Sequence, residues 1–195
     1  MPPYHHGDLR NALLETAVEL IREQGFEAFT LREVARRAKV SHAAPYRHFR
    51  DKADLAAAIA EEGFGLLDAA MERAAGRQEE AAARLVAAGA AYVELALRRP
   101  EHFRIMFASQ IDAAAHPAAR AAADQAFGRL VSLVVACQQA RAIRRGDPLT
   151  LARICWSQVH GIAQLAIGQQ FAFKRQKDVL AFTHEALDTL LLGLG

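Results

Sequence analysis

Cysteine, proline and glycine are scarce in this chain. Its 195 residues include only 2 cysteines, 6 prolines and 12 glycines. Scarce proline and glycine, together with abundant alanine and few strand-favouring residues, favour an all-helical fold. No window approaches about 18 consecutive apolar residues, so we expect no membrane span. No apolar run follows the first residues, so we expect no signal peptide.

The two cysteines, Cys137 and Cys155, lie in apolar surroundings without the spacing of metal ligands. This usage is typical of a reduced, cytoplasmic protein. Because His102, His116 and His184 are scattered and form no HExxH-like pattern, we expect no metal site. We find no nucleophile beside a plausible base, no paired carboxylates in a clear cleft and no phosphate-binding glycine loop. The sequence therefore predicts neither an enzyme nor a cofactor.

What the chain does have is a local excess of positive charge. Its formal net charge is only +2, but the stretch 32–52 carries seven basic residues against two acids, Glu33 and Asp51. The basic residues are Arg32, Arg36, Arg37, Lys39, Arg47, Arg50 and Lys52. Such clustering favours a polyanionic partner. A solvated charged face is the alternative, but the cluster coincides with the motif described below.

Apolar periodicity and capping residues predict about nine helices. We expect them over residues 9–24, 31–38, 42–48, 52–75, 80–98, 100–109, 117–143, 148–168 and 176–192. Gly25 ends the first helix. Thr30 and Glu33 have the spacing of a capping box for the second. Ser41, Asp51 and Asp147 are expected N-cap residues of later helices.

The second and third of these helices, joined by a tight turn at Lys39-Val40, predict a helix-turn-helix. Apolar residues are available to hold the two helices at a fixed angle: Leu31, Val34, Ala35, Ala38, Val40 and Phe49. The third helix has small or polar residues that suit a major groove, namely His42, Ala43, Ala44 and Arg47. Candidate phosphate donors flank it: Thr30, Tyr46, His48 and Lys52. A place in the core is the alternative for Tyr46.

Residues 30–55 resemble the DNA-binding segment of the TetR family of bacterial transcriptional regulators. The spacing that carries this resemblance is formed by Val40-Ser41, Tyr46, Phe49, Lys52 and Leu55. Two residues depart from the family pattern. Lys39 stands where the family usually has glycine, and a left-handed residue other than glycine costs roughly 1–2 kcal/mol. Pro45 stands where Leu or Thr is frequent, and a proline there can shift the start of the recognition helix.

A second resemblance lies in the C-terminal part. Trp156-Ser-Gln-Val-His160-Gly161 is similar to the Trp…His-Gly motif of one C-terminal subgroup of the same family. Trp156 and His160 lie four residues apart and share a helix face, so they are candidates for an effector pocket. Core or dimer-interface packing is the alternative for both. The other pocket candidates are Phe64, Leu67, Met71, Tyr92, Phe103, Met106, Phe107 and Phe127.

The family resemblance implies two domains with different tasks. Residues 1–52 would form a three-helix DNA-binding domain, and residues 53–195 a ligand-binding and dimerisation domain. The residues at phosphates would be Thr30, Tyr46, His48 and Lys52, and those at or near base edges Ser41, His42, Ala43 and Arg47. The last two helices would join a second subunit in a four-helix bundle.

We therefore interpret the chain as a dimeric repressor. It would bind a palindromic operator in duplex DNA, and a small-molecule ligand would release it. The alternative function is a helical ligand-carrier or interaction protein with a vestigial helix-turn-helix.

Overall fold

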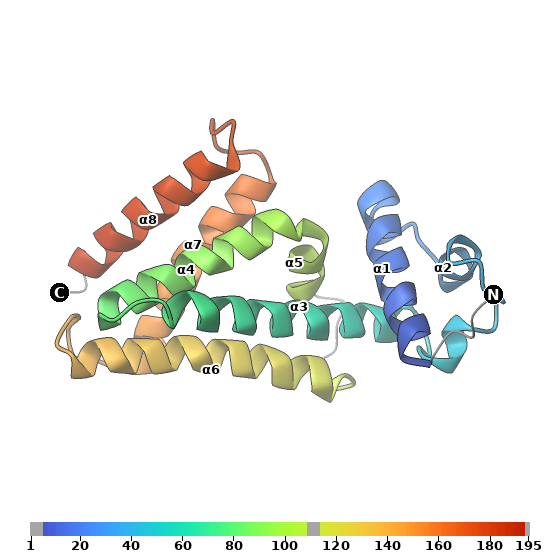
Figure 1. Cartoon of the computed structure of the whole chain (residues 1–195), viewed down its shortest axis with the longest axis horizontal. Helices are drawn as coiled ribbons and strands as arrows, with labels where there is room; N and C mark the ends of the chain where they lie inside the picture. Colours follow the sequence, from blue (N-terminus) through green and yellow to red (C-terminus); the bar gives the residue numbers. More distant parts are fainter. Residues whose placement is uncertain (1–5, 109–113, 194–195) are drawn as a thin grey trace. The chain divides into compact units, whose positions relative to one another are not determined.

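The computed structural model describes residues 6–108 and 114–193, which form eight α-helices and one 3-10 helix, η1 (Figure 1). The elements are α1 (His6–Gln24), α2 (Leu31–Arg37), η1 (Pro45–Arg47), α3 (Lys52–Ala75), α4 (Ala81–Arg98), α5 (Pro100–Met106), α6 (Pro117–Gln139), α7 (Pro148–Ile167) and α8 (Gln176–Gly193). The all-helical prediction is confirmed. The helix expected to reach Ser109 ends at Met106, and Ser109 itself lies outside the described residues.

The chain divides into two compact units. The first comprises the described residues up to Gly63 together with Glu101–Arg120, and the second comprises Phe64–Pro100 and the described residues from Ala121 onward. Helix α3 contributes residues to both units. The functional division expected at residue 52 stays a prediction.

In the first unit, α1 packs against α2, and α2 packs against η1. Gly25 ends α1 as expected, with φ +84° and its N–H bonded to the Ile21 carbonyl at 2.9 Å. Gly63 permits close packing of α5, because a Cβ there would lie 2.6 Å from Met106 Sδ. The core of the unit is formed by Leu13, Ala17, Leu20, Phe29, Val34, Phe49, Leu55 and Ile59.

In the second unit, α4 packs against both α7 and α8 (Figure 1). Gly89 lies where the three helices meet, since a Cβ there would be 2.8 Å from Leu187 Cδ1 and 3.2 Å from Val159 Cγ1. Cys137 and Cys155 are buried free thiols. Burial raises the pKa of both thiols, that of Cys155 to about 11. Both are therefore protonated and unreactive at neutral pH.

Side-chain caps begin three helices where the sequence predicts them, but the cap expected at Ser41 is wrong, because the 3-10 helix that follows begins after Ala44 without a side-chain cap. Glu33 N–H donates to Thr30 Oγ1 at 3.2 Å, Asp54 N–H to Asp51 Oδ1 at 2.8 Å, and Thr150 N–H to Asp147 Oδ2 at 2.9 Å. The capping box is only half formed, because the Glu33 carboxylate accepts from Gln24 Nε2 at 2.9 Å instead of turning back to Thr30.

Three helices end at a left-handed residue that is not glycine. Lys39, Arg141 and Gln169 have φ of 57°, 58° and 55°. The N–H of each following residue reaches back five positions, so each end is a Schellman motif. At the end of α6, Ala142 N–H donates to the Cys137 carbonyl at 2.9 Å. This motif ends α6 at Gln139, so the expected continuation to residue 143 is wrong.

Candidate DNA-binding surface and effector site

The turn between α2 and η1 has the conformation that the sequence predicts for it. Lys39 is left-handed, and Val40 N–H donates to the Ala35 carbonyl at 3.0 Å. This hydrogen bond satisfies one of the carbonyls left unpaired at the end of α2. The lysine therefore adopts the left-handed conformation expected at this position, at a conformational cost of roughly 1–2 kcal/mol.

The recognition segment differs from the α-helix expected over 42–48. Residues 42–44 form a turn, and a single 3-10 helix follows at Pro45–Arg47. Proline has no N–H, so Pro45 cannot donate the α-helical bond to the Ser41 carbonyl. That carbonyl accepts from Ala44 N–H at 2.9 Å instead, and His48 N–H bonds the Pro45 carbonyl at 2.9 Å. The proline thus delays and tightens the helix start, as the departure from the family pattern suggested.

The predicted DNA-contacting residues lie largely on the surface of the first unit. The exposed ones are Thr30, Ser41, His42, Ala43, Tyr46 and Arg47, while His48 and Lys52 are half-buried. Tyr46 is 51% exposed, which excludes the core alternative for its ring. Ala44 is buried at 9% exposure, so its expected place on the outer face is wrong. Their contacts with DNA stay a prediction.

Some of the positive charge in this stretch is neutralised within the unit. Arg37 forms a bidentate pair with Glu23 at 2.9 and 2.6 Å, and hydrogen bonds from Arg37 lower the pKa of the Glu23 carboxyl. Arg50 Nη2 bonds Asp54 Oδ1 at 3.1 Å. Arg36 lies 3.6 Å from Glu33, so among the described residues the exposed cations without an ion pair in this stretch are Arg32, Lys39 and Arg47. These three remain available to a polyanion.

Lys52, the first residue of α3, is held by the segment that follows α1. Its Nζ donates to the Glu27 carbonyl at 3.0 Å. The same Nζ lies 4.6 Å from the ring centroid of Phe26 and 4.7 Å from that of Phe29. Sequence reasoning missed this arrangement, because the residues involved are 23 to 26 positions apart and have no motif spacing. The sequence offers a single indication of this arrangement, the turn at Gly25-Phe26 that follows α1.

A polar and aromatic cluster joins α4 to α7 in the second unit. Trp156 Nε1 donates to Tyr92 Oη at 3.2 Å, and that oxygen lies 2.8 Å from His160 Nδ1. The Phe127 and Trp156 rings meet edge to face at 5.9 Å. Burial raises the pKa of the Tyr92 phenol and lowers the pKa of the His160 imidazole. The cluster is therefore uncharged at neutral pH, which suits an apolar or hydrogen-bonding ligand.

The ten pocket candidates are divided between the two units. Those in the second unit are Phe64, Leu67, Met71, Tyr92, Phe127, Trp156 and His160, and those in the first are Phe103, Met106 and Phe107. All except Phe107, Phe127, Trp156 and His160 are buried. The structure brings Tyr92, Trp156 and His160 into direct contact. That all ten line one cavity stays a prediction.

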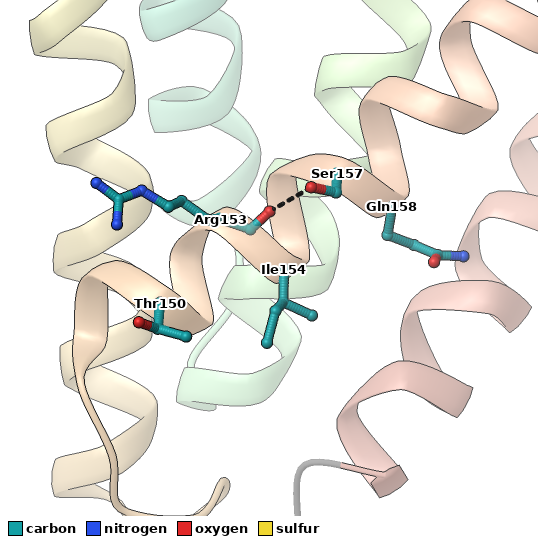
Figure 2. A pocket seen from close by; sticks show the side chains of 5 residues that line it. All are labelled: Thr150, Arg153, Ile154, Ser157 and Gln158. Atoms are coloured by element: carbon teal, nitrogen blue, oxygen red, sulfur yellow. Dashed lines mark hydrogen bonds between the residues drawn. The ribbon is translucent and has the colours of Figure 1, made fainter.

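An open hollow of ≈ 590 Å³ lies along α7, and sequence reasoning missed it (Figure 2). Its lining residues come from one face of the helix: Thr150, Arg153, Ile154, Ser157 and Gln158. They follow the spacing i, i+3, i+4, i+7 and i+8, which could have identified the face in advance. Gly161 continues the same face, and a Cβ there would meet nothing within 4 Å among the residues that the structure describes.

Within residues 6–108 and 114–193, no three His, Cys, Asp or Glu residues are grouped so that they would hold a metal ion. In the same part, no helix combines the length and the apolar character needed to cross a membrane.

Both parts of the chain match known families. Residues 13–59 match the family described as bacterial regulatory proteins, tetR family. Residues 85–190 match the family described as tetracyclin repressor-like, C-terminal domain. The first match contains the predicted helix-turn-helix, and the second contains the segment from Trp156 to Gly161.

Solved structures agree with these matches over the whole chain. A protein with unknown function from Rhodococcus sp. RHA1 is 37% identical, with a TM-score of 0.87, and the match covers 100% of this chain and 99% of that one. The TetR family regulator PfmR from Thermus thermophilus is 20% identical, with a TM-score of 0.76 and coverages of 94% and 98%. FadR from Bacillus subtilis, solved in complex with stearoyl-CoA, is 17% identical, with a TM-score of 0.78 and coverages of 95% and 99%. The chain therefore belongs to the TetR family of bacterial transcriptional regulators, which are not enzymes.

Proposed function

We propose that this protein is a dimeric repressor that binds a palindromic operator and leaves it when a small molecule binds the C-terminal part. The exposed residues of the recognition segment, Ser41, His42, Ala43, Tyr46 and Arg47, carry this proposal. They lie in the segment that matches the family's DNA-binding model, and buried residues on α2 and beside η1 hold them in place. We place this activity in the cytoplasm, with the DNA.

Within this proposal, base edges are read by Ser41, His42, Ala43 and Arg47, and phosphates are contacted by Thr30, Tyr46, His48 and Lys52. Tyr46 and Arg47 are exposed neighbours on η1. A short 3-10 helix presents fewer side chains to a groove than two turns of α-helix do. The exposed turn before it, with His42 and Ala43, therefore has to supply part of the base contacts.

The operator contact is tested by capturing genomic fragments on the purified protein and measuring affinity for a retained fragment. We expect His42→Ala and Arg47→Ala each to weaken binding to that fragment by roughly tenfold or more, with a smaller loss on unrelated DNA. Arg144→Gln, which removes an exposed charge between α6 and α7, is the matched control and should bind as the wild type does.

Two results would contradict base reading. Equal losses on cognate and unrelated DNA would reduce His42 and Arg47 to general electrostatic contacts. Only uniform binding of genomic DNA, or none at any salt concentration, would favour the alternative of a ligand carrier or interaction protein with a vestigial helix-turn-helix.

For the effector, we propose an apolar ligand with a hydrogen-bonding group, bound beside Tyr92, Trp156 and His160. The FadR relative is solved with stearoyl-CoA, so stearoyl-CoA is our first probe. Trp156 is the single tryptophan of the chain, and its fluorescence therefore reports on this cluster alone. Saturable change of that emission, at the concentrations that release the operator fragment, supports the proposal. Release of DNA with unchanged emission would place the effector elsewhere.

For the homodimer, we propose that α7 and α8 pair with the same helices of a second copy. Large apolar side chains are exposed on both helices, with Leu149 at 44%, Leu165 at 45% and Leu192 at 83%. Gly161 lies on the face that includes Leu165 and the hollow of Figure 2. A glycine inside a helix costs about 1 kcal/mol relative to alanine, and no atom of the described residues would lie within 4 Å of a Cβ at Gly161.

We expect Gly161→Leu to shift the protein from dimer to monomer in sedimentation velocity, because the added side chain would occupy the surface on which the second copy packs. Gly128→Leu, at an equally open position on α6, is the matched control and should remain dimeric. A monomeric wild type at micromolar concentration, or a dimeric Gly161→Leu variant, would contradict this interface.

A further inference from the structure

Two phenylalanines and a backbone carbonyl enclose the ammonium group of Lys52 in the first unit. Phe26 and Phe29 meet edge to face, with ring centroids 5.6 Å apart and an interplanar angle of 75°. Lys52 Nζ lies 4.6 and 4.7 Å from the two centroids. It also donates a hydrogen bond to the Glu27 carbonyl at 3.0 Å. The side chain of Lys52 is therefore fixed at its charged end.

This arrangement leaves part of the ammonium group available. A lysine has three N–H donors, and Glu27 accepts from one of them. Lys52 is only half-buried and its bond to Glu27 lies at the exposed surface, so a partner outside the chain can approach the charge. A ring face attracts a cation electrostatically and carries no net charge, so the two phenylalanines orient the ammonium group without neutralising it.

The two rings differ in what else they do. Phe29 is 1% exposed and belongs to the core of the unit. Phe26 is half-buried and lies in the turn that follows α1. Removal of the Phe29 ring would open the core, whereas loss of the Phe26 ring removes its contact with Lys52 and one edge-to-face contact with Phe29. Phe26 therefore offers a test of orientation separate from folding.

We propose that Phe26 is a positioning residue for DNA binding: it holds the Lys52 ammonium in the orientation in which that group contacts a backbone phosphate. This inference rests on the proposed function, because it needs Lys52 to contact DNA. A lysine on a flexible side chain loses conformational freedom when it binds a phosphate. A lysine that is already held loses less, so its contact contributes more to affinity.

The test compares the salt dependence of binding to a mixed-sequence DNA duplex for the wild type, Phe26→Leu, Lys52→Met and the double variant. Each phosphate contact contributes about one unit to the slope of log affinity against log salt. We expect Lys52→Met to lower the slope by about one unit. We expect Phe26→Leu to lower it by most of one unit, to weaken binding roughly threefold to tenfold, and to add nothing in the Lys52→Met background.

Conservative and remote variants separate orientation from folding. Phe26→Tyr keeps an aromatic face and should restore the slope. Phe173→Leu, which removes a partly exposed ring between α7 and α8, should bind as the wild type does. The thermal unfolding temperature of every variant is recorded, because a purely structural effect would change that temperature without changing the salt slope.

Each contrary result overturns a different statement. If Phe26→Leu keeps the wild-type slope while Lys52→Met lowers it, Phe26 only packs against Lys52 and the inference is wrong. If Lys52→Met also keeps the slope, Lys52 contacts no phosphate and there is nothing to position, although DNA binding stands. If the wild type shows no salt-dependent DNA binding, the proposed function itself fails.

Discussion

Replacing Asp68 with alanine is expected to lower the free energy of unfolding by about 2–3 kcal/mol, because the change leaves a cation without its partner inside the second unit. Asp68 is 6% exposed on α3. It accepts hydrogen bonds from Arg129 Nε, from Arg129 Nη2 at 2.9 Å and from Gln125 Nε2 at 2.8 Å. For a domain of this size, the loss corresponds to a fall of roughly 5–10 °C in the unfolding temperature, measurable by calorimetry.

The dependence of this effect on pH follows from the same contacts. Hydrogen bonds from Arg129 lower the pKa of Asp68, although burial opposes them. A carboxyl whose folded pKa lies below its unfolded value, near 4, contributes its full stabilisation above that value. The stabilisation is lost as the pH falls through the lower, folded pKa. The difference between wild type and Asp68→Ala should therefore be full at pH 7 and shrink below about pH 4.

A paired replacement provides the control for Asp68. Asp68→Leu combined with Arg129→Met removes both charges and fills the space with apolar side chains, so it should recover much of the lost stability. Arg129 also lies 3.3 Å from Glu72, which is exposed and offers only weak compensation in the single variant. An Asp68→Ala protein that unfolds at the wild-type temperature at pH 7 would show that the pair carries no net stabilisation.

Local features of this fold could be predicted from the sequence because they depend on residues close together in the chain. Thr30, Asp51 and Asp147 cap their helices as expected, since an N-cap bonds an N–H only two or three residues later. The left-handed Lys39 also follows from its place in the turn. Pro45 was correctly expected to alter the start of the recognition helix. The extent of the change depends on which carbonyls the neighbouring N–H groups reach, because Pro45 itself has no N–H.

Contacts between distant residues could not be predicted in this way. The pair of Asp68 with Arg129 joins residues 61 positions apart, and neither belongs to a motif. The rings around Lys52 and the contact of Tyr92 with His160 are similar cases, because the sequence identifies one partner and the packing of helices selects the other. Motif spacing therefore located the recognition segment, whereas the contacts that orient Lys52 could be found only in the structure.

Replacing Gly89 with alanine is expected to destabilise the second unit by about 1–2 kcal/mol, although alanine is the better helix former. The gain in helix propensity is about 1 kcal/mol, and overpacking of a buried site costs typically 1–3 kcal/mol. The new Cβ would lie 2.8 Å from Leu187 Cδ1 and 3.2 Å from Val159 Cγ1, and two such contacts place this site in the upper part of that range. Leu187 and Val159 are 4% and 5% exposed, so neither can move into solvent. Urea unfolding monitored by circular dichroism measures the change.

Whether a glycine-to-alanine change lowers or raises stability depends on how crowded the site of the new methyl group is. Other glycines of the chain allow us to isolate this factor. Gly65→Ala and Gly128→Ala place the same methyl group within α3 and α6, where no atom of the described part of the chain lies within 4 Å. Both should leave stability unchanged or raise it by up to about 1 kcal/mol. Leu187→Val should relieve the clash in the Gly89→Ala background, so the two changes together should cost less than the sum of their separate effects. If Gly89→Ala were as stable as the two controls, α4 could move away from α7 and α8 at little cost, and the close approach of these helices would not be a requirement of the fold.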